Sequence, residues 1–337
     1  MSSPRRLATA ALAALLLANL AAPARAVTID WVTVGDPGNA ADDTTYGAVA
    51  DSFQIMKYEF TNQQYTDFLN SVAATDTYSL YNTNMGSNAR GGITRSGASG
   101  SYTYAVRTNM GDKPVNFVSW FDAARVANWL QNGATGTSST ETGAYTLVGG
   151  QTSGTAPAVN SGATFYIPTE DQWYKAAYYK GGGTNAGYWN YATQSDTDPT
   201  AVTSGSTGIG SAGSMGNFAN YNSAASWNGQ TGNVTTVGTN GGPSAYEIYD
   251  MSGNVREWND LTGAAGSSRG LRGGNWNSPA FDFSSSSRLA LAPSNESNFN
   301  GFRLASPVAV PEPSTYAMAL AGLACGGYSM FRRRKRA

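Results

Sequence analysis

The stretch YDMSGNVREW, residues 249–258, carries more information about the fold than any other part of the sequence. It combines a Gly-containing turn with charged and aromatic residues. Two blocks of similar character follow it, LRGGNW at 271–276 and GFRLA at 301–305. No segment repeats another at a fixed period, which excludes a solenoid or a propeller. The blocks predict short structured segments within an irregular domain.

Three short helices are expected upstream of these blocks. Thr61, Ser119 and Thr169 are residue types that cap helix starts, and apolar residues follow each of them at helical spacing. The predicted helices cover 63–71, run from Ser119 to Asn132-Gly133, and run from Thr169 to Gly181-Gly182-Gly183.

Long polar stretches separate the predicted helices. Residues 53–60 have strand propensity, whereas 75–110, 134–163 and 184–243 are rich in Gly, Ser, Thr and Asn and are expected to be loops or surface excursions. Few helices, scattered strands and long loops indicate an α+β domain with little regular secondary structure.

The composition describes a folded domain with a neutral polar surface. Charged residues make up only 13% of the chain, about half the usual share. Eight Trp, 19 Tyr and 12 Phe supply a core and argue against disorder, although the chain has 40 Gly.

Two residue counts exclude most familiar active sites. The chain has no histidine, which excludes Ser-His-Asp catalysis, His-ligated zinc or haem, and the two-His-one-carboxylate iron site. Its one cysteine, Cys325, lies in an apolar tail segment. The folded part therefore has no disulfide, thiolate nucleophile or cysteine metal site.

The N-terminal 26 residues have the pattern of a secretory signal peptide. Arg5-Arg6 precede an apolar run from Leu7 to Ala22, and Ala24-Arg25-Ala26 fit a cleavage site. We expect the export machinery to recognise residues 1–26 and cleavage to follow Ala26. The alternative is an uncleaved anchor helix.

The C-terminal segment, residues 310–337, has three parts. Val310-Pro311-Glu312-Pro313-Ser314 precedes an apolar stretch at 316–331, and Arg332-Arg333-Arg334-Lys335-Arg336 follows it. The apolar stretch would span roughly 24 Å as a helix, a marginal membrane segment. The positive-inside rule would then place residues 27–313 outside the cytoplasm.

The three parts together resemble the PEP-CTERM sorting signal of Gram-negative bacteria. This resemblance implies processing by an exosortase and delivery to the cell surface or an exopolysaccharide matrix. A plain C-terminal membrane anchor is the alternative.

The exported part is acidic. Three basic residues precede residue 27 and five follow residue 313, so residues 27–313 carry 13 Lys and Arg against 22 Asp and Glu, a formal net charge of −9. Such a domain is a poor candidate for nucleic-acid binding and a better one for divalent cations or neutral glycans.

Six blocks in order carry a family resemblance. They are EFTNQQYTDFLN, PVNFVSWFDAARVANWL, YIPTEDQWYKAAYY, YDMSGNVREW, LRGGNW and GFRLA. Over roughly residues 28–306 they resemble the formylglycine-generating enzyme (sulfatase-modifying factor) family, with a domain expected at 27–309. The resemblance implies an irregular variant of the C-type lectin fold with long loops. It also implies an oxygen-dependent, copper-binding oxidation of a sulfatase cysteine that uses a pair of cysteines.

The sequence departs from the family at that cysteine pair. The two positions map near Ser278 and Phe283, and neither side chain can hold Cu(I), which needs soft thiolate ligands. Copper and formylglycine formation are therefore not expected. A related branch that makes sulfoxides needs histidines, and the chain has none.

The resemblance also implies a calcium site. The resemblance places it in the loop of Asp250, Gly253, Val255 and Glu257, where two carboxylates and two carbonyls would supply the hard oxygen ligands that calcium prefers. The alternative is a plain turn in which Asp250 caps and Glu257 pairs with Arg256, Arg272 or Arg303. A second family calcium site would map onto the Asn220 side chain and the Tyr221 carbonyl, with a ligand near Asn228.

Other notable residues have ordinary structural interpretations. The tryptophans of the family blocks are expected in the core, and Arg272 and Arg303 are expected to tie loops to carboxylates and carbonyls. The acidic residues Asp122, Glu170 and Asp171 are expected at helix starts rather than in catalysis. The Tyr-rich and Asn-rich loops at 78–104 and 188–221 have a composition typical of binding loops.

Three functions remain open. The first is a noncatalytic, calcium-stabilised scaffold at the bacterial surface that binds glycans or proteins. The second is a formylglycine-generating oxidoreductase with a variant site. The third is a structural protein of the exopolysaccharide matrix without a discrete ligand.

Overall fold

The computed structural model describes residues 27–308. The predicted signal peptide, the apolar stretch at 316–331 and Cys325 lie outside this range. Within residues 27–308, no helix is both long enough and apolar enough to span a membrane.

Three helices begin where the sequence predicts. Helix α1 covers Asn62–Val72, α3 covers Trp120–Gln131 and α4 covers Glu170–Tyr178. Each starts with a capping box, in which the side chain of Thr61, Ser119 or Thr169 accepts a backbone N–H and the side chain three residues later accepts one in return. Helix α4 stops before the expected glycines, because Tyr179 adopts an extended conformation.

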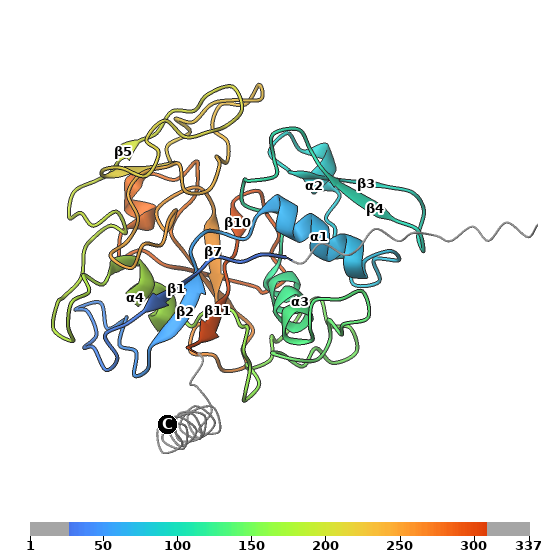
Figure 1. Cartoon of the computed structure of the whole chain (residues 1–337), viewed down its shortest axis with the longest axis horizontal. Helices are drawn as coiled ribbons and strands as arrows, with labels where there is room; N and C mark the ends of the chain where they lie inside the picture. Colours follow the sequence, from blue (N-terminus) through green and yellow to red (C-terminus); the bar gives the residue numbers. More distant parts are fainter. Residues whose placement is uncertain (1–26, 309–337) are drawn as a thin grey trace, which may run out of the picture.

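A three-stranded sheet joins the two ends of the domain. Strand β2 (Phe53–Met56) pairs antiparallel with β1 (Trp31–Val34) and with β11 (Ala305–Pro307). A second sheet has the order β10 (Asn300–Gly301), β7 (Arg256–Asn259), β8 (Arg269–Arg272), β9 (Leu289–Leu291). In Figure 1, helix α4 lies on one side of β7 and helices α1 and α3 lie on the other.

Part of the stretch predicted as loop is ordered differently. Between residues 75 and 110 the chain forms α2 (Asn84–Ser87) and an antiparallel hairpin of β3 (Ile93–Ser96) and β4 (Thr103–Val106). The hairpin packs against α1, where Tyr104 exchanges two hydrogen bonds with the Asn70 side chain. Residues 184–243 contain only the two-residue pair β5 (Thr200–Ala201) and β6 (Phe218–Ala219), together with isolated bridges.

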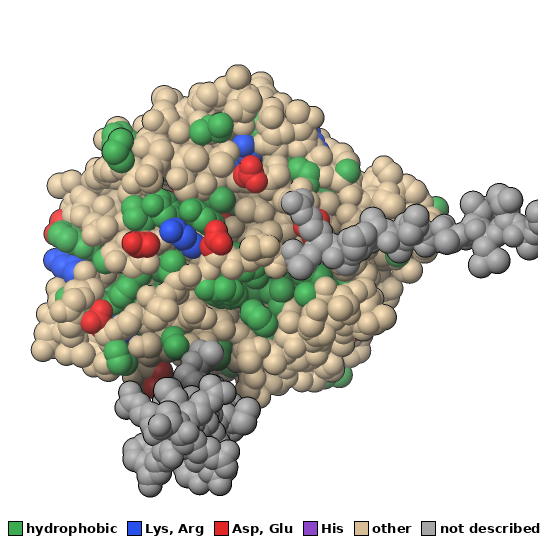
Figure 2. All heavy atoms as spheres, in the orientation of Figure 1, with side chains coloured by type: hydrophobic (Ala, Val, Ile, Leu, Met, Phe, Trp, Pro, Cys, Tyr) green, Lys and Arg blue, Asp and Glu red, His purple; other side chains and the backbone are tan. Residues whose placement is uncertain are grey.

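The core has the aromatic character that the composition predicts. Trp120, Trp129, Trp173 and Trp258 are at most 1% exposed and Trp276 is 4% exposed, which confirms the prediction for all five. One cluster lies around α1 and α3, and another lies between α4 and the β1–β2 sheet. The face shown in Figure 2 is mostly neutral, with few charged side chains. The domain is α+β with little regular secondary structure, as predicted.

Candidate functional site

The turn at residues 250–254 has a backbone that only certain residues tolerate. Asp250, Gly253 and Asn254 have φ values of 62°, 84° and 61°, the left-handed region favoured by Gly, Asn and Asp. A Cβ atom on Gly253 would lie 2.2 Å from the Asn220 carbonyl oxygen. The glycine therefore lets the turn pack directly against the backbone at Asn220, whose carbonyl accepts the Asn254 N–H at 2.9 Å.

Asp250 is held by the loop that precedes it. Its Oδ2 accepts the Gly238 N–H at 2.5 Å and its Oδ1 accepts the Asn240 amide at 2.7 Å. Burial raises the pKa of Asp250, although these hydrogen bonds oppose the shift. The carboxylate thus closes the loop 238–250 by hydrogen bonding.

Glu257 lies on β7 and is fully buried. Its oxygens accept hydrogen bonds from Arg303 Nε and Nη2, both at 2.6 Å, and from Trp173 Nε1 at 2.7 Å. Of the three arginines named from the sequence, Arg303 is therefore the partner. The predicted role of Arg303 in tying segments together is confirmed.

Glu59 is a member of this group that sequence reasoning missed. It is fully buried, and its two oxygens accept the Asn254 amide at 2.6 Å and the Val255 N–H at 3.2 Å. Burial and the neighbouring Asp250 and Glu257 carboxylates raise its pKa well above the ordinary value. The available signal was an acidic residue between Tyr58 and Phe60 in a strand-like segment.

Asn220 joins the same buried network. Its Nδ2 donates to the Asn233 carbonyl at 2.9 Å and to Asn254 Oδ1 at 3.1 Å, whereas its Oδ1 is buried without a hydrogen-bond partner. Tyr221 and Asn228 make contacts outside this network. The Tyr221 ring packs on Phe283 and its carbonyl accepts the Ala224 N–H, and Asn228 reaches the Ala89 carbonyl.

The donor atoms of this region fit calcium better than any softer metal. They are carboxylate, amide and carbonyl oxygens, and the unpartnered Asn220 Oδ1 is a buried acceptor with unused capacity. Among residues 27–308, no three acidic side chains are placed to ligate one ion. A calcium ion here would therefore combine one or two carboxylates with neutral oxygens, and it would share Glu257 with Arg303.

The residues at the two family cysteine positions make other contacts. Ser278 Oγ donates to Asp282 at 2.9 Å and accepts the Asn275 amide at 3.0 Å. Phe283 is fully buried against the rings of Tyr191 and Tyr221. A hydroxyl and a phenyl ring do not fit copper, and we derive no copper chemistry for this chain.

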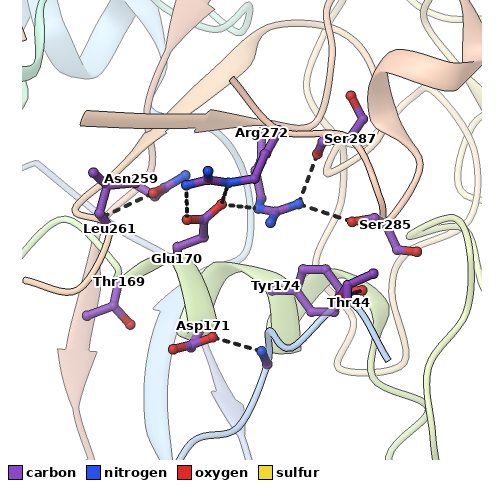
Figure 3. Close-up of polar contacts among 12 residues, drawn as sticks. Thr44, Thr169, Glu170, Asp171, Tyr174, Asn259, Leu261, Arg272, Ser285 and Ser287 are labelled. Atoms are coloured by element: carbon purple, nitrogen blue, oxygen red, sulfur yellow. Dashed lines mark hydrogen bonds and ion pairs between the residues drawn. The ribbon is translucent and has the colours of Figure 1, made fainter. Parts of the chain in front are cut away.

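The acidic residues at the helix starts have structural partners. Asp122 completes the capping box of α3. Glu170 binds two arginines, with Arg272 Nε at 2.8 Å and Arg288 Nη2 at 2.7 Å. Asp171 accepts the Gly47 N–H at 2.9 Å (Figure 3). Arg272 also donates to two carbonyls, which confirms its predicted role in tying loops.

An open hollow of about 120 Å³ adjoins Arg272 and Arg288. Arg256, Arg272 and Arg288 line it together with Asp282 and Ser287. Arg256 pairs with Asp282 at 2.8 Å. The hollow adjoins the segment that corresponds to the family's cysteine pair, because Gly274 and Asp282 both line it.

The fold and the site together define an irregular α+β domain of the formylglycine-generating type that lacks the catalytic thiols within residues 27–308. The chain belongs to the family of the sulfatase-modifying factor enzyme 1-like domain, whose model matches residues 32–308. A PEP-CTERM protein-sorting motif matches residues 309–335.

Three solved structures are similar to this chain at low sequence identity, and CarF, with a TM-score above 0.5, shares its fold. The crystal structure of CarF is 22% identical, with a TM-score of 0.53 over 84% of this chain and 99% of CarF. Treponema denticola variable protein 1 is 19% identical, with a TM-score of 0.48 over 84% of this chain and 97% of its own. PvdO from Pseudomonas aeruginosa is also 19% identical, with a TM-score of 0.42 over 83% and 92%. The comparison with curated proteins found no match.

The sorting motif gives the chain its destination. It marks an exported protein of this family that is processed by exosortase-type machinery. The motif implies that the protein is associated with the cell surface or the extracellular matrix of a Gram-negative bacterium.

Proposed function

We propose that this chain is a noncatalytic, calcium-stabilised scaffold that binds a glycan or a surface protein at the cell surface or in the exopolysaccharide matrix. The observation that carries the proposal is the fate of the two cysteine positions. Ser278 is engaged in a hydrogen-bond network and Phe283 is part of the core. Reactivity at this place would require groups that the two side chains do not offer.

The long loops support a binding role because they are cross-braced. Arg90, in the first long stretch, donates to the Thr231 carbonyl at 2.8 Å and to the Gly232 carbonyl at 2.9 Å in another long stretch. Its guanidinium also lies 4.3 Å from the centre of a Trp276 ring. Loops held in one arrangement lose less conformational entropy when a ligand binds.

Calcium is supported by an imbalance of buried charge. Glu59, Asp250 and Glu257 interact electrostatically with one another and with a single guanidinium, that of Arg303. Two fully buried carboxylates and a partly buried one, with a single cation among them, are costly unless a proton or a metal ion compensates. A calcium ion held by the 250–257 loop, with Asn220 and Tyr221 as candidates for a second ion, would supply the missing positive charge.

The two ends of the chain complete the proposal. Residues 1–26 would direct export, and the apolar stretch at 316–331 would hold the chain in the membrane until processing. These segments lie outside the described residues, and they are assigned from sequence.

The proposal is tested by the metal content of the purified full-length protein, paired with an oxygen-uptake assay on a sulfatase-type cysteine peptide. We expect about one or two equivalents of calcium, no stoichiometric copper and no oxygen uptake. Saturable binding in a glycan and surface-protein array should accompany this result. Copper with turnover would overturn the noncatalytic assignment. Calcium without any saturable ligand would identify a structural matrix protein instead.

A further inference from the structure

The hollow beside Ser278 and Phe283 is locally basic in an acidic domain. Its wall contains three arginines, and only two carboxylates balance them, because Arg272 and Arg288 share Glu170 while Arg256 pairs with Asp282. The wall therefore carries one excess positive charge, whereas residues 27–313 carry −9.

Two of the arginines can reach a ligand. The side chains of Arg256 and Arg288 are 22% and 39% exposed, whereas that of Arg272 is 1% exposed. Arg288 uses Nε and Nη2 on Glu170, and Arg256 uses Nη2 on Asp282 and Ser278. Neither Nη1 has a hydrogen-bond partner within the described residues. A guanidinium with free N–H groups is a good donor to oxyanions.

The arginines are fixed in place before any ligand arrives. Arg272 is stacked at 4.7 Å and 5.0 Å from the ring centres of Tyr46 and Tyr174, and Glu170 is bound to both Arg272 and Arg288 (Figure 3). Such preorganisation lowers the cost of binding an anion.

One exposed apolar side chain lines the hollow, and another precedes a lining residue in the chain. Leu289 lines the hollow and is 38% exposed, and Phe281, the residue before Asp282, is 67% exposed. Exposed side chains of this size next to a charged hollow suit a ligand with an apolar ring face and an acidic group.

We propose that this hollow binds the carboxylate of an acidic sugar, with Arg256 and Arg288 as its donors and Phe281 and Leu289 beside the sugar ring. The proposal rests on the proposed binding function and names its ligand class. The hollow has room for a carboxylate group, and the ring would lie at its mouth.

Calorimetric titration of the full-length protein tests this proposal. The probes are galacturonate, acetate and galactose, which separate an acidic sugar from a free carboxylate and from a neutral sugar. We expect galacturonate to bind best, acetate more weakly and galactose not at all, with affinity falling as salt increases. Acetate binding as tightly as galacturonate would overturn the role of the sugar ring. Galactose binding as tightly as galacturonate would overturn the role of the carboxylate.

Three variants and one matched control test whether the named residues of the hollow bind the sugar. Arg256→Gln and Arg288→Gln should each weaken galacturonate binding about tenfold, the loss of one charged hydrogen bond. Asp282→Asn should strengthen it, because it releases Arg256. Arg95→Gln is the control and should leave galacturonate binding unchanged. Arg95 is 24% exposed and pairs with Asp76 at 2.9 Å, but it lies on β3 and does not line the hollow.

The outcomes separate this inference from the proposed function. The proposed site is wrong if galacturonate does not bind at about 10 mM, which means a ΔG° weaker than roughly −3 kcal/mol. It is also wrong if binding is unchanged in both Arg256→Gln and Arg288→Gln. Array binding to a neutral glycan or a protein that survives both substitutions would leave the scaffold function standing without it. Galacturonate binding that depends on the arginines, with no polymer or protein bound, would support the hollow and count against the scaffold.

Discussion

Glu257 and Arg303 form a bidentate ion pair with both oxygens engaged, at 2.6 Å for each N–O contact, and both side chains are at most 1% exposed. Arg303 also donates to the carbonyls of Met56 at 3.0 Å and Tyr249 at 2.8 Å. One guanidinium therefore connects the end of β2, the start of the 249–258 stretch and strand β7. The pair fixes the turn that carries the candidate calcium ligands.

Neutralising Glu257 should be strongly destabilising with or without calcium. Glu257→Gln removes one partner of a buried, bidentate ion pair, which typically costs about 3–5 kcal/mol. Urea unfolding followed by tryptophan fluorescence measures the loss. Glu247→Gln is the control, because Glu247 is 77% exposed and lies 3.9 Å from Lys57, and it should change the free energy of unfolding by less than about 0.5 kcal/mol. Equal effects of the two substitutions would contradict the role of the buried pair.

Calcium removal should lower the melting temperature of the wild-type protein, and Asp250→Asn should abolish that dependence. The substitution suits the left-handed backbone and keeps an acceptor for the Gly238 N–H, but it loses the Asn240 hydrogen bond because its own amide N–H groups face that donor. It should therefore lower stability in both conditions, and the diagnostic result is the shift between calcium and EGTA. Melting curves in calcium and in EGTA provide the measurement.

Asp76→Asn is a matched control for the calcium experiment. Asp76 also has a left-handed backbone, with φ of 54°, and also accepts a backbone N–H, from Leu80 at 2.7 Å. Its variant should keep the full shift between calcium and EGTA. A wild-type melting temperature that does not respond to EGTA would show that hydrogen bonds and protonation alone compensate the buried carboxylates.

Local signals made the helices and the tryptophan core predictable from the sequence. Thr61, Ser119 and Thr169 each start a helix because a capping box depends on residues only three positions apart. The hairpin at 93–106 was missed because its stability comes from contacts with α1, such as those of Tyr104, and not from a strong strand pattern.

The hollow and the network around Glu59 could not be predicted from the sequence, because each depends on contacts between distant parts of the chain. The hollow combines Arg256 on β7, Arg272 on β8 and Arg288 beyond the 3₁₀ helix η1 (Ala280–Phe283), and it is held by Glu170 on α4. No residue spacing in the sequence indicates that these four side chains lie together. The family resemblance directed attention to Asp250 and Glu257, but the burial of Glu59 beside them depends on the packed tertiary structure.

Phe283→Ala should destabilise the domain as a core substitution does. Phe283 is fully buried and makes edge-on contacts with Tyr191 and Tyr221 at 5.7 Å and 4.9 Å between ring centres. Truncation should cost about 3–5 kcal/mol, measured by urea unfolding. Phe281→Ala, two residues away and 67% exposed, should cost less than about 0.5 kcal/mol. A small effect at Phe283 would show that this position retains the open character of a catalytic pocket.

Lys113 should give the protein a measurable gain in stability at alkaline pH. Burial lowers its pKa from the ordinary 10.5 to about 8, although the ammonium donates to the Thr207 carbonyl and the Thr236 hydroxyl at 2.8 Å each. Between those two pH values the unfolded chain binds more protons than the folded one, so stability rises with pH, with a slope on the order of 1 kcal/mol per pH unit. The slope should be missing from Lys113→Met, compared with wild type by urea unfolding from pH 7 to 10. Identical pH profiles would mean that Lys113 keeps its ordinary pKa.

Glu170 and Asp171 are adjacent acids on the first turn of α4, yet their neutralisation should have very different effects. Glu170→Gln removes the negative charge that balances Arg272, which is 1% exposed and keeps only neutral acceptors, the Ser285 and Ser287 carbonyls and the amide oxygen at position 170. We expect a loss of about 3–5 kcal/mol for that unpaired buried charge. Asp171→Asn keeps an acceptor for the Gly47 N–H and loses only a favourable charge at a helix N-terminus, about 0.3–1 kcal/mol. Urea unfolding of the two variants side by side provides the comparison. Similar losses would show that Glu170 acts mainly as a helix-start charge, and that the arginines beside the hollow are held by their carbonyl and aromatic contacts.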